Sequence, residues 1–567
     1  MERQTGLKTV LCMLNAKYIH SGLAPYYLKA AAQENCAYDH CITIVEGTIN
    51  RPANVLGRLM EEEYDVYGFS CYIWNIERVL ELIKEVKARR PHCTVLLGGP
   101  EVSYRAEDVL NEYPFVDAVI SGEGEVPFAH LLDALASGGL LSAGGAAGLS
   151  CRVRDGSVVT TPPGAADFVP PSPYLTEYPM GLQGRMAYVE SSRGCPFACS
   201  FCLSGRHESV RFFPLDRAKA DLVLAANSGA KTVKLIDRTF NCNPKRAQEI
   251  WAFLLCAYEN GTIPKDVRFH FEIGADLLTK ENLAFLRTVP KGMFQFEAGI
   301  QSLQPNTLSA VCRKTDVGVL KENLRSIMEL GSIHLHVDLI AGLPFEGMAE
   351  FADSFNGTFA LRPHALQLGF LKLLYGTELR NTAEGWGCVY RKDAPYEVIS
   401  THAMGAEDLQ RLHLLEDALE RLYNSNRFLN TVEYLLKAHG KGAFELFDYI
   451  GSKVQAQAGV DLFCYTEQLY TTLIKEDWVE PMALRDVLLM DLYASIRRPK
   501  LPQCLRVMDD RLSSLRMAAR KNGAGDAAIL YHGRERVLYV DYAKKDAITG
   551  RYSISMKKII DGESRGE

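Results

Sequence analysis

The sequence lacks any apolar run of the roughly 20 residues that an α-helix needs to cross a bilayer. Its first ten residues, MERQTGLKTV, hold no secretory hydrophobic stretch. Apolar residues make up 47% of the 567-residue chain and charged residues 23%, which is typical of a folded soluble protein. We therefore expect a cytoplasmic protein of two to four domains with no membrane partner.

A strong charge of one sign is also absent, since the formal net charge is -6. This balance gives no global attraction to nucleic acid, so we expect no nucleic-acid partner. The stretch from Arg497 to Lys521 is locally basic, and it is interpreted either as a phosphate-contacting surface or as a solvated helix face. The 15 cysteines are odd in number, and the expected cytoplasmic compartment is reducing. Both facts argue against a disulfide framework.

Residues 8 to 136 alternate short apolar runs with helical patterns such as IERVLELIKEVKARR (76–90). Buried parallel strands have continuous runs of Val, Ile and Leu because both faces of their sheet are covered. Five such strands are predicted, at 8–14, 42–46, 66–70, 94–99 and 118–121. The pattern predicts an α/β doubly wound, Rossmann-like sheet that binds its ligand at the carboxyl ends of the strands.

The turns at these predicted strand ends carry LNAKYIHSG (14–22), SCYIWN (70–75), GGPEVS (98–103) and SGEGE (121–125). Glycine in such turns permits positive φ and a close approach of the backbone to a ligand. The alternative interpretation is that the glycines only allow tight turns between strand and helix.

A second alternating series begins near Arg185, with strands predicted at 186–190, 232–236, 268–273, 293–300, 333–340 and 366–373. Six βα units predict an open or complete barrel, whose chemistry lies at the carboxyl ends of its strands. After about residue 380 the pattern becomes mainly helical, as in AEDLQRLHLLEDALERLY (406–423), and residues 531–543 suggest a final hairpin.

Three cysteines, Cys195, Cys199 and Cys202, follow the first strand of this second series in SRGCPFACSFC. A structural zinc site normally combines two separated CxxC halves, and no second half follows here. Three thiolates are able to hold a [4Fe-4S] cluster while one iron stays open to a small molecule. The cysteine spacing therefore predicts an iron-sulfur site at the carboxyl end of a barrel strand.

The CxxxCxxC motif after a first barrel strand, with Phe201 between its last two cysteines, resembles the radical S-adenosylmethionine (SAM) superfamily. The resemblance implies that the three cysteines ligate a [4Fe-4S] cluster and that the remaining iron chelates SAM. Reduction by an external donor such as flavodoxin or ferredoxin would then give a 5'-deoxyadenosyl radical.

Further motifs of the superfamily suggest SAM-binding residues. KLIDRTFN (234–241) follows the second strand, FEAGIQS (296–302) resembles a strand and turn of one branch, and SAVCRKTD carries an arginine suited to a carboxylate. DLIAGLPFE (338–346) is similar to a pattern bordering adenine, although Phe345 replaces its second glycine, which argues against a tight glycine turn there. The resemblance implies SAM contacts from Phe201, Asp237, Arg238, Glu297, Gln301, Arg313 and Gly342.

A doubly wound domain before such a barrel resembles the cobalamin-binding class of the superfamily, and the motif set resembles a subgroup with a C-terminal domain of unassigned function. The chain lacks the D-x-H-x-x-G motif of histidine-ligated cobalamin proteins, and His20 is the one nearby histidine. We expect cobalamin contacts from Asn15, Ser70, Tyr72, Trp74, Gly98, Gly99, Glu101, Gly122 and Glu123. Trp74 has an alternative interpretation as core packing.

The resemblance implies a cobalamin-binding Rossmann domain over residues 1–140, a linker over 141–182, a radical SAM partial (βα)6 barrel over 183–380 and a mainly helical domain over 381–567. It also implies methyl transfer to an unactivated carbon of a small-molecule or other substrate. Alternatives are radical cyclisation, rearrangement or methylthiolation without methylcobalamin. An alternative of another class is an iron-sulfur sensor or nucleic-acid-binding protein.

Overall fold

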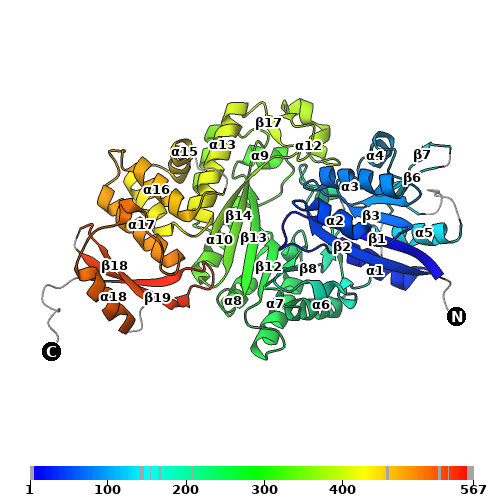
Figure 1. Cartoon of the computed structure of the whole chain (residues 1–567). Helices are drawn as coiled ribbons and strands as arrows, with labels where there is room; N and C mark the ends of the chain where they lie inside the picture. The colour runs from blue at the N-terminus through cyan, green and yellow to red at the C-terminus, as the bar shows by residue number, and fades with distance from the viewer. Residues whose placement is uncertain are drawn as a thin grey trace. The chain divides into compact units, whose positions relative to one another are not determined.

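The structure is a computed structural model that describes residues 5–138, 146–153, 155–164, 168–206, 209–454, 459–521, 525–533 and 535–558 (Figure 1). Its contacts divide the chain into two compact units. The first comprises Met1–Asn282, Val311–Lys314 and Leu371–Ile399, and the second comprises Leu283–Ala310, Thr315–Phe370 and Ser400–Glu567. Within the described residues, no helix combines the length and apolar character that a bilayer span requires.

The N-terminal part of the first unit is the predicted doubly wound sheet, with strand order β2-β1-β3-β4-β5-β6-β7. Its parallel strands are β1 (Thr5–Asn15), β2 (Asp39–Thr48), β3 (Val66–Ser70), β4 (Thr94–Gly98) and β5 (Ala118–Ile120). The connecting helices are α1 (Ala24–Asn35), α2 (Pro52–Leu59), α3 (Ile76–Arg89), α4 (Ala106–Glu112) and α5 (Glu125–Ala136). Apolar residues of α2, α3 and α4 pack on one face of the sheet, and those of α1 and α5 pack on the other.

Two antiparallel strands extend this sheet beyond β5, in the range predicted to be a linker. β6 (Leu149–Arg152) pairs with β5, and β7 (Val158–Val159) pairs with β6. The buried Leu149 and Cys151 join the core that includes α1 and α5, which explains why this short stretch is ordered against the sheet. Most of the small-residue segment 138–148 lies outside the described residues.

The strands of the six predicted βα repeats come next in the chain. Three of these strands belong to the first compact unit and three to the second. In the first unit, β8 (Met186–Val189), β11 (Thr232–Leu235) and β12 (Arg268–Ile273) pair in parallel in the order β12-β11-β8. The helices after them are α6 (Leu215–Asn227), α7 (Pro244–Glu259) and α8 (Lys280–Leu286), of which α8 is divided between the two units after Asn282. A short antiparallel ribbon of β9 (Ser192–Arg193) and β10 (Arg211–Phe212) lies between β8 and α6 in the chain.

In the second unit, β13 (Phe294–Gln301), β14 (His334–Ala341) and β15 (Ala365–Phe370) form a parallel set in which β14 lies between the other two. Buried residues alternate with half-buried ones along β13 and β14. The buried face is apolar, while the half-buried face of β13 carries Gln295, Glu297, Gly299 and Gln301. The helices after these strands are α9 (Pro305–Ala310), α10 (Val317–Leu330), α11 (Met348–Phe359) and α12 (Glu378–Asn381), of which α12 belongs to the first unit.

The C-terminal part is mainly helical, as predicted. Its helices are α13 (Ala406–Leu419), α14 (Leu429–His439), α15 (Ala443–Lys453), α16 (Leu462–Leu473), α17 (Pro481–Ser495) and α18 (Arg511–Lys521). The predicted final hairpin is a three-stranded antiparallel sheet of β18 (Asp526–Leu530), β19 (Arg536–Lys545) and β20 (Tyr552–Lys558). The first strand of this sheet begins at Asp526, five residues before the predicted hairpin at 531–543, and the third strand, β20, was not predicted.

The basic stretch from Arg497 to Lys521 includes α18, and part of its charge is paired. Arg511 contacts Asp509 at 2.6 Å and Glu535 at 2.7 Å, and Arg516 contacts Asp526 at 3.3 Å. Carboxylates at these distances compete with a phosphate backbone for the same guanidinium groups. The pairing favours the interpretation of this stretch as a solvated helix face.

Candidate active site: a cysteine loop beside an apolar cavity

The cysteine loop, defined here as the described residues 194–206 and 209–210, leaves the carboxyl end of β8 and is closed at its base by the β9–β10 ribbon. Arg193 pairs with Arg211, and Ser192 pairs with Phe212. Gly194 opens the loop with φ of +95°, and a Cβ there would lie 2.5 Å from the Ser209 carbonyl oxygen. Glycine is therefore required where the two arms of the loop approach each other.

The three cysteine side chains lie within this loop at different depths. Cys195 and Cys199 are buried and Cys202 is half-buried. Burial raises the pKa of the Cys199 thiol, while the Arg313 guanidinium, whose Nη1 lies 3.9 Å from the Cys199 sulfur, acts in the opposite direction. A positive charge beside a buried thiol favours the thiolate that binds metal.

The donor set fits a cluster better than a single ion. Within the described part of the chain, the group of three potential ligands whose atoms all lie within 4.8 Å of one another is Cys36, His40 and Asp133, and the cysteine loop contributes no such group. A single ion draws its ligands to one centre, whereas a cubane binds each thiolate through a different iron atom. Three cysteine thiolates on one loop are a donor set that suits an iron-sulfur cubane with one iron left open.

Two predicted SAM-binding residues follow β11 and lie in different environments. Asp237 is buried and accepts hydrogen bonds from Ser191 N at 3.0 Å, Ser191 Oγ at 2.8 Å and Ser192 Oγ. Burial raises the pKa of this carboxyl group, and the serine hydrogen bonds oppose that rise. Arg238 is exposed and lines the cavity described below. Asp237 thus fixes the start of the cysteine loop, and its contact with SAM stays a prediction.

The remaining predicted SAM residues differ in their surroundings. Phe201 is half-buried in the cysteine loop. In the second unit, Glu297 and Gln301 share the half-buried face of β13, and the Gln301 side-chain oxygen is buried without a hydrogen-bond partner. Gly342, directly after β14, has φ of +87°. The contacts of Phe201, Glu297, Gln301 and Gly342 with SAM stay predictions.

The structure corrects one expectation about the loop after β14. Phe345 was expected to disfavour a tight glycine turn, yet its φ is +62°, so the backbone adopts the left-handed conformation with a phenylalanine. The Phe345 side chain is 60% exposed. The left-handed conformation costs a non-glycine residue about 1–2 kcal/mol, and strain of this kind gathers at functional loops.

An apolar cavity of about 400 Å³ lies in the first unit beside the cysteine loop. Its wall includes the carboxyl ends of β3 and β4, the start of α1, the turn after β5, and residues around β8, β9 and β11. Ligand pockets in proteins commonly range from about 300 to 1,000 Å³, and strand carboxyl ends are where doubly wound sheets bind ligands. The cavity therefore has the position predicted for a corrinoid.

Six of the nine predicted cobalamin-binding residues line this cavity: Ser70, Tyr72, Gly98, Gly99, Gly122 and Glu123. Gly99 has φ of +110°, and a Cβ there would lie 2.5 Å from the Cys71 carbonyl oxygen. Gly122 has φ of +80°. These two glycines are required by the turns themselves, and the same turns form the cavity wall.

The other three predicted residues do not line the cavity and are engaged elsewhere. Asn15 is buried and donates from Nδ2 to Glu46 Oε2 at 2.9 Å. Glu101 is buried and accepts hydrogen bonds from Tyr396 and Arg105. Trp74 is 45% exposed and stacks on Tyr72 with ring centroids 4.3 Å apart, so the structure does not place it in the core.

Several cavity residues were missed by the sequence analysis, notably Tyr27, Glu125, Glu190 and Arg193. Arg193 and Glu125 stand in the motifs SSRGC and GEGE, where their charges were the available signal. Glu190 and Tyr27 gave no such signal, because their role depends on distant segments meeting at the cavity. Among the described residues, no histidine lines the cavity, and His20 Nδ1 is instead 2.7 Å from the Tyr188 hydroxyl.

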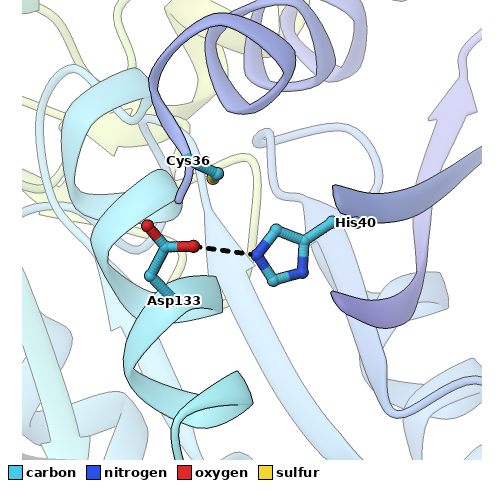
Figure 2. Close-up of side chains that lie close together, drawn as sticks. All are labelled: Cys36, His40 and Asp133. Carbon is cyan, nitrogen blue, oxygen red and sulfur yellow. Dashed lines mark hydrogen bonds and ion pairs between the residues drawn. The ribbon is translucent and has the colours of Figure 1, made fainter. Parts of the chain in front are cut away.

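The N-terminal cysteines do not offer a second metal site. Burial raises the pKa of Cys12 to about 12 and that of Cys71 well above its usual range, which disfavours the thiolate form. Figure 2 shows Cys36, which follows α1, with His40 on β2 and Asp133 on α5.

The atoms of His40 and Asp133 that could bind a metal ion already form hydrogen bonds within the protein. His40 Nδ1 accepts the Leu7 N–H at 3.1 Å, so the ring proton lies on Nε2, which donates to Asp133 Oδ1 at 3.1 Å. Asp133 Oδ2 accepts the Ala37 N–H at 2.7 Å. The trio therefore ties α5 to the turn before β2, and neither ring nitrogen keeps a free lone pair for a metal.

Comparison with protein families matches three consecutive parts of the chain. A family described as "B12 binding domain" matches residues 10–132, the "Radical SAM superfamily" matches residues 189–356, and a "Protein of unknown function (DUF4080)" family matches residues 384–529. The first match contains the doubly wound sheet through β5, and the second contains the cysteine loop. These domains bring three cofactors, namely cobalamin, a [4Fe-4S] cluster and SAM.

Curated relatives include the cobalamin-dependent radical SAM methyltransferase TokK of Streptomyces tokunonensis. It is 29% identical over 333 residues, covering 53% of this chain and 46% of the relative. The hopanoid C-3 methylase of Methylococcus capsulatus is 27% identical over 332 residues, covering 56% of this chain and 61% of the relative. The chain thus spans about half the length of the curated relatives it matches.

Solved structures share the fold. The cobalamin-dependent SAM radical enzyme OxsB with aqua-cobalamin bound has a TM-score of 0.57 at 15% identity, covering 88% of this chain and 82% of that one. The radical SAM methyltransferase TsrM from Kitasatospora setae, with cobalamin and a [4Fe-4S] cluster bound, has a TM-score of 0.55 at 18% identity, covering 68% and 76%.

Proposed function

Because the chain belongs to the radical SAM superfamily and carries a B12 binding domain, we propose that it is a cobalamin-dependent methyltransferase acting on an unactivated carbon. The cluster supplies the electron for reductive cleavage of SAM, and cobalamin supplies a methyl group. The proposed substrate is a small molecule or another substrate of unknown identity, and the proposed electron donor is an external protein such as flavodoxin or ferredoxin.

The observation that carries the proposal is that one wall serves both the cysteine loop and the apolar cavity. Arg193 lines the cavity and stands two residues before Cys195. Leu203, directly after Cys202, lines the cavity as well. Methyl transfer to a carbon that must first lose hydrogen requires both cofactors at one reaction site, and this shared wall supports that arrangement.

The side chains present suit each cofactor. Cys195, Cys199 and Cys202 would hold three irons, with Arg313 offsetting the charge near Cys199. Tyr72 and the glycine backbones at Gly98 and Gly99 would border the corrinoid. No histidine is among the described residues that line the cavity, so these residues would hold the corrinoid through tyrosine, backbone and apolar groups without an imidazole.

The test is anaerobic reconstitution with iron, sulfide and hydroxocobalamin, followed by incubation with SAM and dithionite. We expect an iron-sulfur absorption band, retained corrinoid and formation of 5'-deoxyadenosine. Cys199→Ala should abolish 5'-deoxyadenosine, while Cys256→Ala, an exposed cysteine on α7, should leave its yield unchanged. A colourless zinc protein, or 5'-deoxyadenosine from Cys199→Ala, would overturn the proposal.

A further inference from the structure

We infer that the cysteine loop is anchored to the wall of the corrinoid cavity at two points, so that cobalamin binding and cluster assembly favour each other. The inference rests on the proposed function and adds a positioning role for Arg193, Arg211, Glu123, Glu101 and Tyr396. All five residues belong to the first unit of the chain.

The first anchor is the Arg193 guanidinium at the base of the loop. Its Nη1 donates to Glu123 at 2.6 Å, its Nη2 to Glu125 at 2.6 Å and its Nε to Glu190 at 2.9 Å. Only 16% of the Arg193 side chain is exposed. Charge-assisted hydrogen bonds in such a buried setting fix position strongly, because each broken bond leaves a charge without a partner.

Arg211, on the opposite arm of the ribbon, holds the same carboxylate. Its Nη2 lies 2.6 Å from Glu123 Oε1 and 2.7 Å from Glu123 Oε2. Glu123 thus contacts both arms of the cysteine loop while also lining the cavity, and it follows Gly122 in the turn after β5. Arg211 itself does not line the cavity. A change at Arg211 therefore perturbs the anchor without removing a cavity wall.

The second anchor runs from the middle of the loop to the turn after β4. The Ser200 carbonyl oxygen accepts the Leu379 N–H at 2.9 Å. Tyr396, in the same 371–399 segment as Leu379, donates its hydroxyl to Glu101, which Arg105 also contacts at 3.1 Å. Glu101 lies two residues after Gly99, which with Gly98 lines the cavity. Segment 371–399 therefore braces the loop against the β4 turn.

This brace has its own rigid core. The Arg380 guanidinium lies 3.7 Å from the Tyr375 ring centroid and 5.0 Å from that of Tyr396. The Arg105 guanidinium lies 4.4 Å from the same Tyr375 ring. Stacked cations and rings hold the segment in one conformation. Movement of the turn after β4 is therefore transmitted through this segment to Leu379, whose N–H donates to the Ser200 carbonyl oxygen.

Two turns of the cavity wall thus each carry one support of the cysteine loop. A ligand that orders those turns reduces the conformational entropy that the loop loses when it takes up a cluster. By thermodynamic linkage, the cluster must raise cobalamin affinity by the same factor. Couplings of this kind are typically about 5- to 150-fold.

The experiment measures hydroxocobalamin binding by equilibrium dialysis to the cluster-free and the cluster-reconstituted protein, without SAM. We expect reconstitution to tighten binding of wild-type protein by about 5-fold or more. In Arg211→Gln and in Tyr396→Phe the ratio of the two dissociation constants should fall, and in the double variant it should approach one. Using the ratio cancels any direct effect of a substitution on cobalamin affinity.

Glu81→Gln is the matched control, since Glu81 forms an exposed pair with Arg78 on α3 of the same domain. Its ratio should equal that of wild type. Arg211→Lys, which keeps the positive charge on a shorter side chain without the planar guanidinium group, should give an intermediate ratio. A second readout is the rate at which a chelator removes iron, which hydroxocobalamin should slow in wild type and leave unchanged in the double variant.

A wild-type ratio near one would overturn the inference and leave the proposed function intact, because cobalamin would still bind. A full wild-type ratio in the folded double variant would overturn the role of these residues. If Arg211→Gln does not fold, Tyr396→Phe and Arg211→Lys decide the outcome. Absence of hydroxocobalamin binding to either form would instead overturn the proposed function itself.

Discussion

Two groups of metal-ligand side chains in the first unit contrast in how their atoms are used. In the cysteine loop, Cys195, Cys199 and Cys202 are spread over one loop, and a cation near Cys199 favours its thiolate. In the group of Cys36, His40 and Asp133, the ligand-type atoms lie within 4.8 Å of one another but already bond to the protein. Closeness of potential ligand atoms therefore does not by itself make a metal site, because those atoms must also keep lone pairs that no hydrogen bond uses.

The largest test of this contrast is iron content after reconstitution. Cys195→Ala should lose nearly all cluster iron, since two thiolates cannot hold three corners of a cubane. Cys36→Ala should retain the wild-type iron content, because Cys36 belongs to a saturated structural group. Colorimetric iron and sulfide assays with absorption spectra measure both. Iron lost equally from both variants would break the comparison.

Glu346, a buried carboxyl group of the second unit, combines one oxygen that accepts hydrogen bonds with one that has no partner. Glu346 Oε1 accepts from Ser302 Oγ at 2.6 Å and Ser354 Oγ at 2.7 Å, whereas Oε2 is buried without a hydrogen-bond partner. Burial raises the pKa of Glu346 to about 7, against the opposing hydrogen bonds from the two serines. The folded protein therefore keeps this proton at pH values where the unfolded chain has lost it.

The sign of the pH dependence follows from this raised pKa. Stability from Glu346 is fully present below about pH 4.5 and is lost as pH rises to about 7, a change on the order of 3 kcal/mol. Glu346→Gln, which resembles the protonated form, should remove this dependence and be more stable than wild type at pH 8. Urea unfolding at several pH values measures it, and an unchanged pH slope in the variant would contradict the assignment.

The smallest expected effect concerns the saturated trio. Burial opposes ionisation of Asp133, but hydrogen bonds from Ala37, His40 and Tyr38 hold its pKa below the usual range. Asp133→Asn should lower the free energy of unfolding by about 1–2 kcal/mol with no change in iron content, because it weakens charge-assisted hydrogen bonds. Asp266→Asn, at an exposed pair with Lys231, is the control and should leave the free energy of unfolding nearly unchanged, because solvent screens the pair. Loss of bound metal from Asp133→Asn would show that the trio is a metal site after all.

Much of the fold was predictable because hydrophobic runs mark buried strands directly. The predicted strand at 66–70 is β3 itself, and the predicted 268–273 is β12. β6 and β7 were missed because they are short and follow a stretch rich in small residues, so only their pairing with β5 makes them strands. Phe345 shows the opposite case, where a local rule against positive φ was overridden by the surrounding loop.

The candidate site was predictable where backbone geometry decides the outcome. Gly99 and Gly122 line the cavity because the turns that need them are the turns at the strand ends. Glu101 and Asn15 lie at the same strand ends, but their partners, Tyr396 and Glu46, come from distant parts of the sequence. Period and motif identify which strand ends meet, whereas the partner that claims a polar side chain depends on the assembled fold.

The closeness of the backbones at Gly99 and Cys71 has a consequence for evolution of this crevice. Because even a methyl group at position 99 would collide with a carbonyl oxygen, ligand preference here cannot be tuned by mutating that residue. At Gly99 the cavity wall is peptide backbone packed on the Cys71 backbone, so it presents no side chain that mutation could exchange. Adaptation to a different ligand must therefore come from lining positions that carry side chains, such as Tyr72 and Arg238.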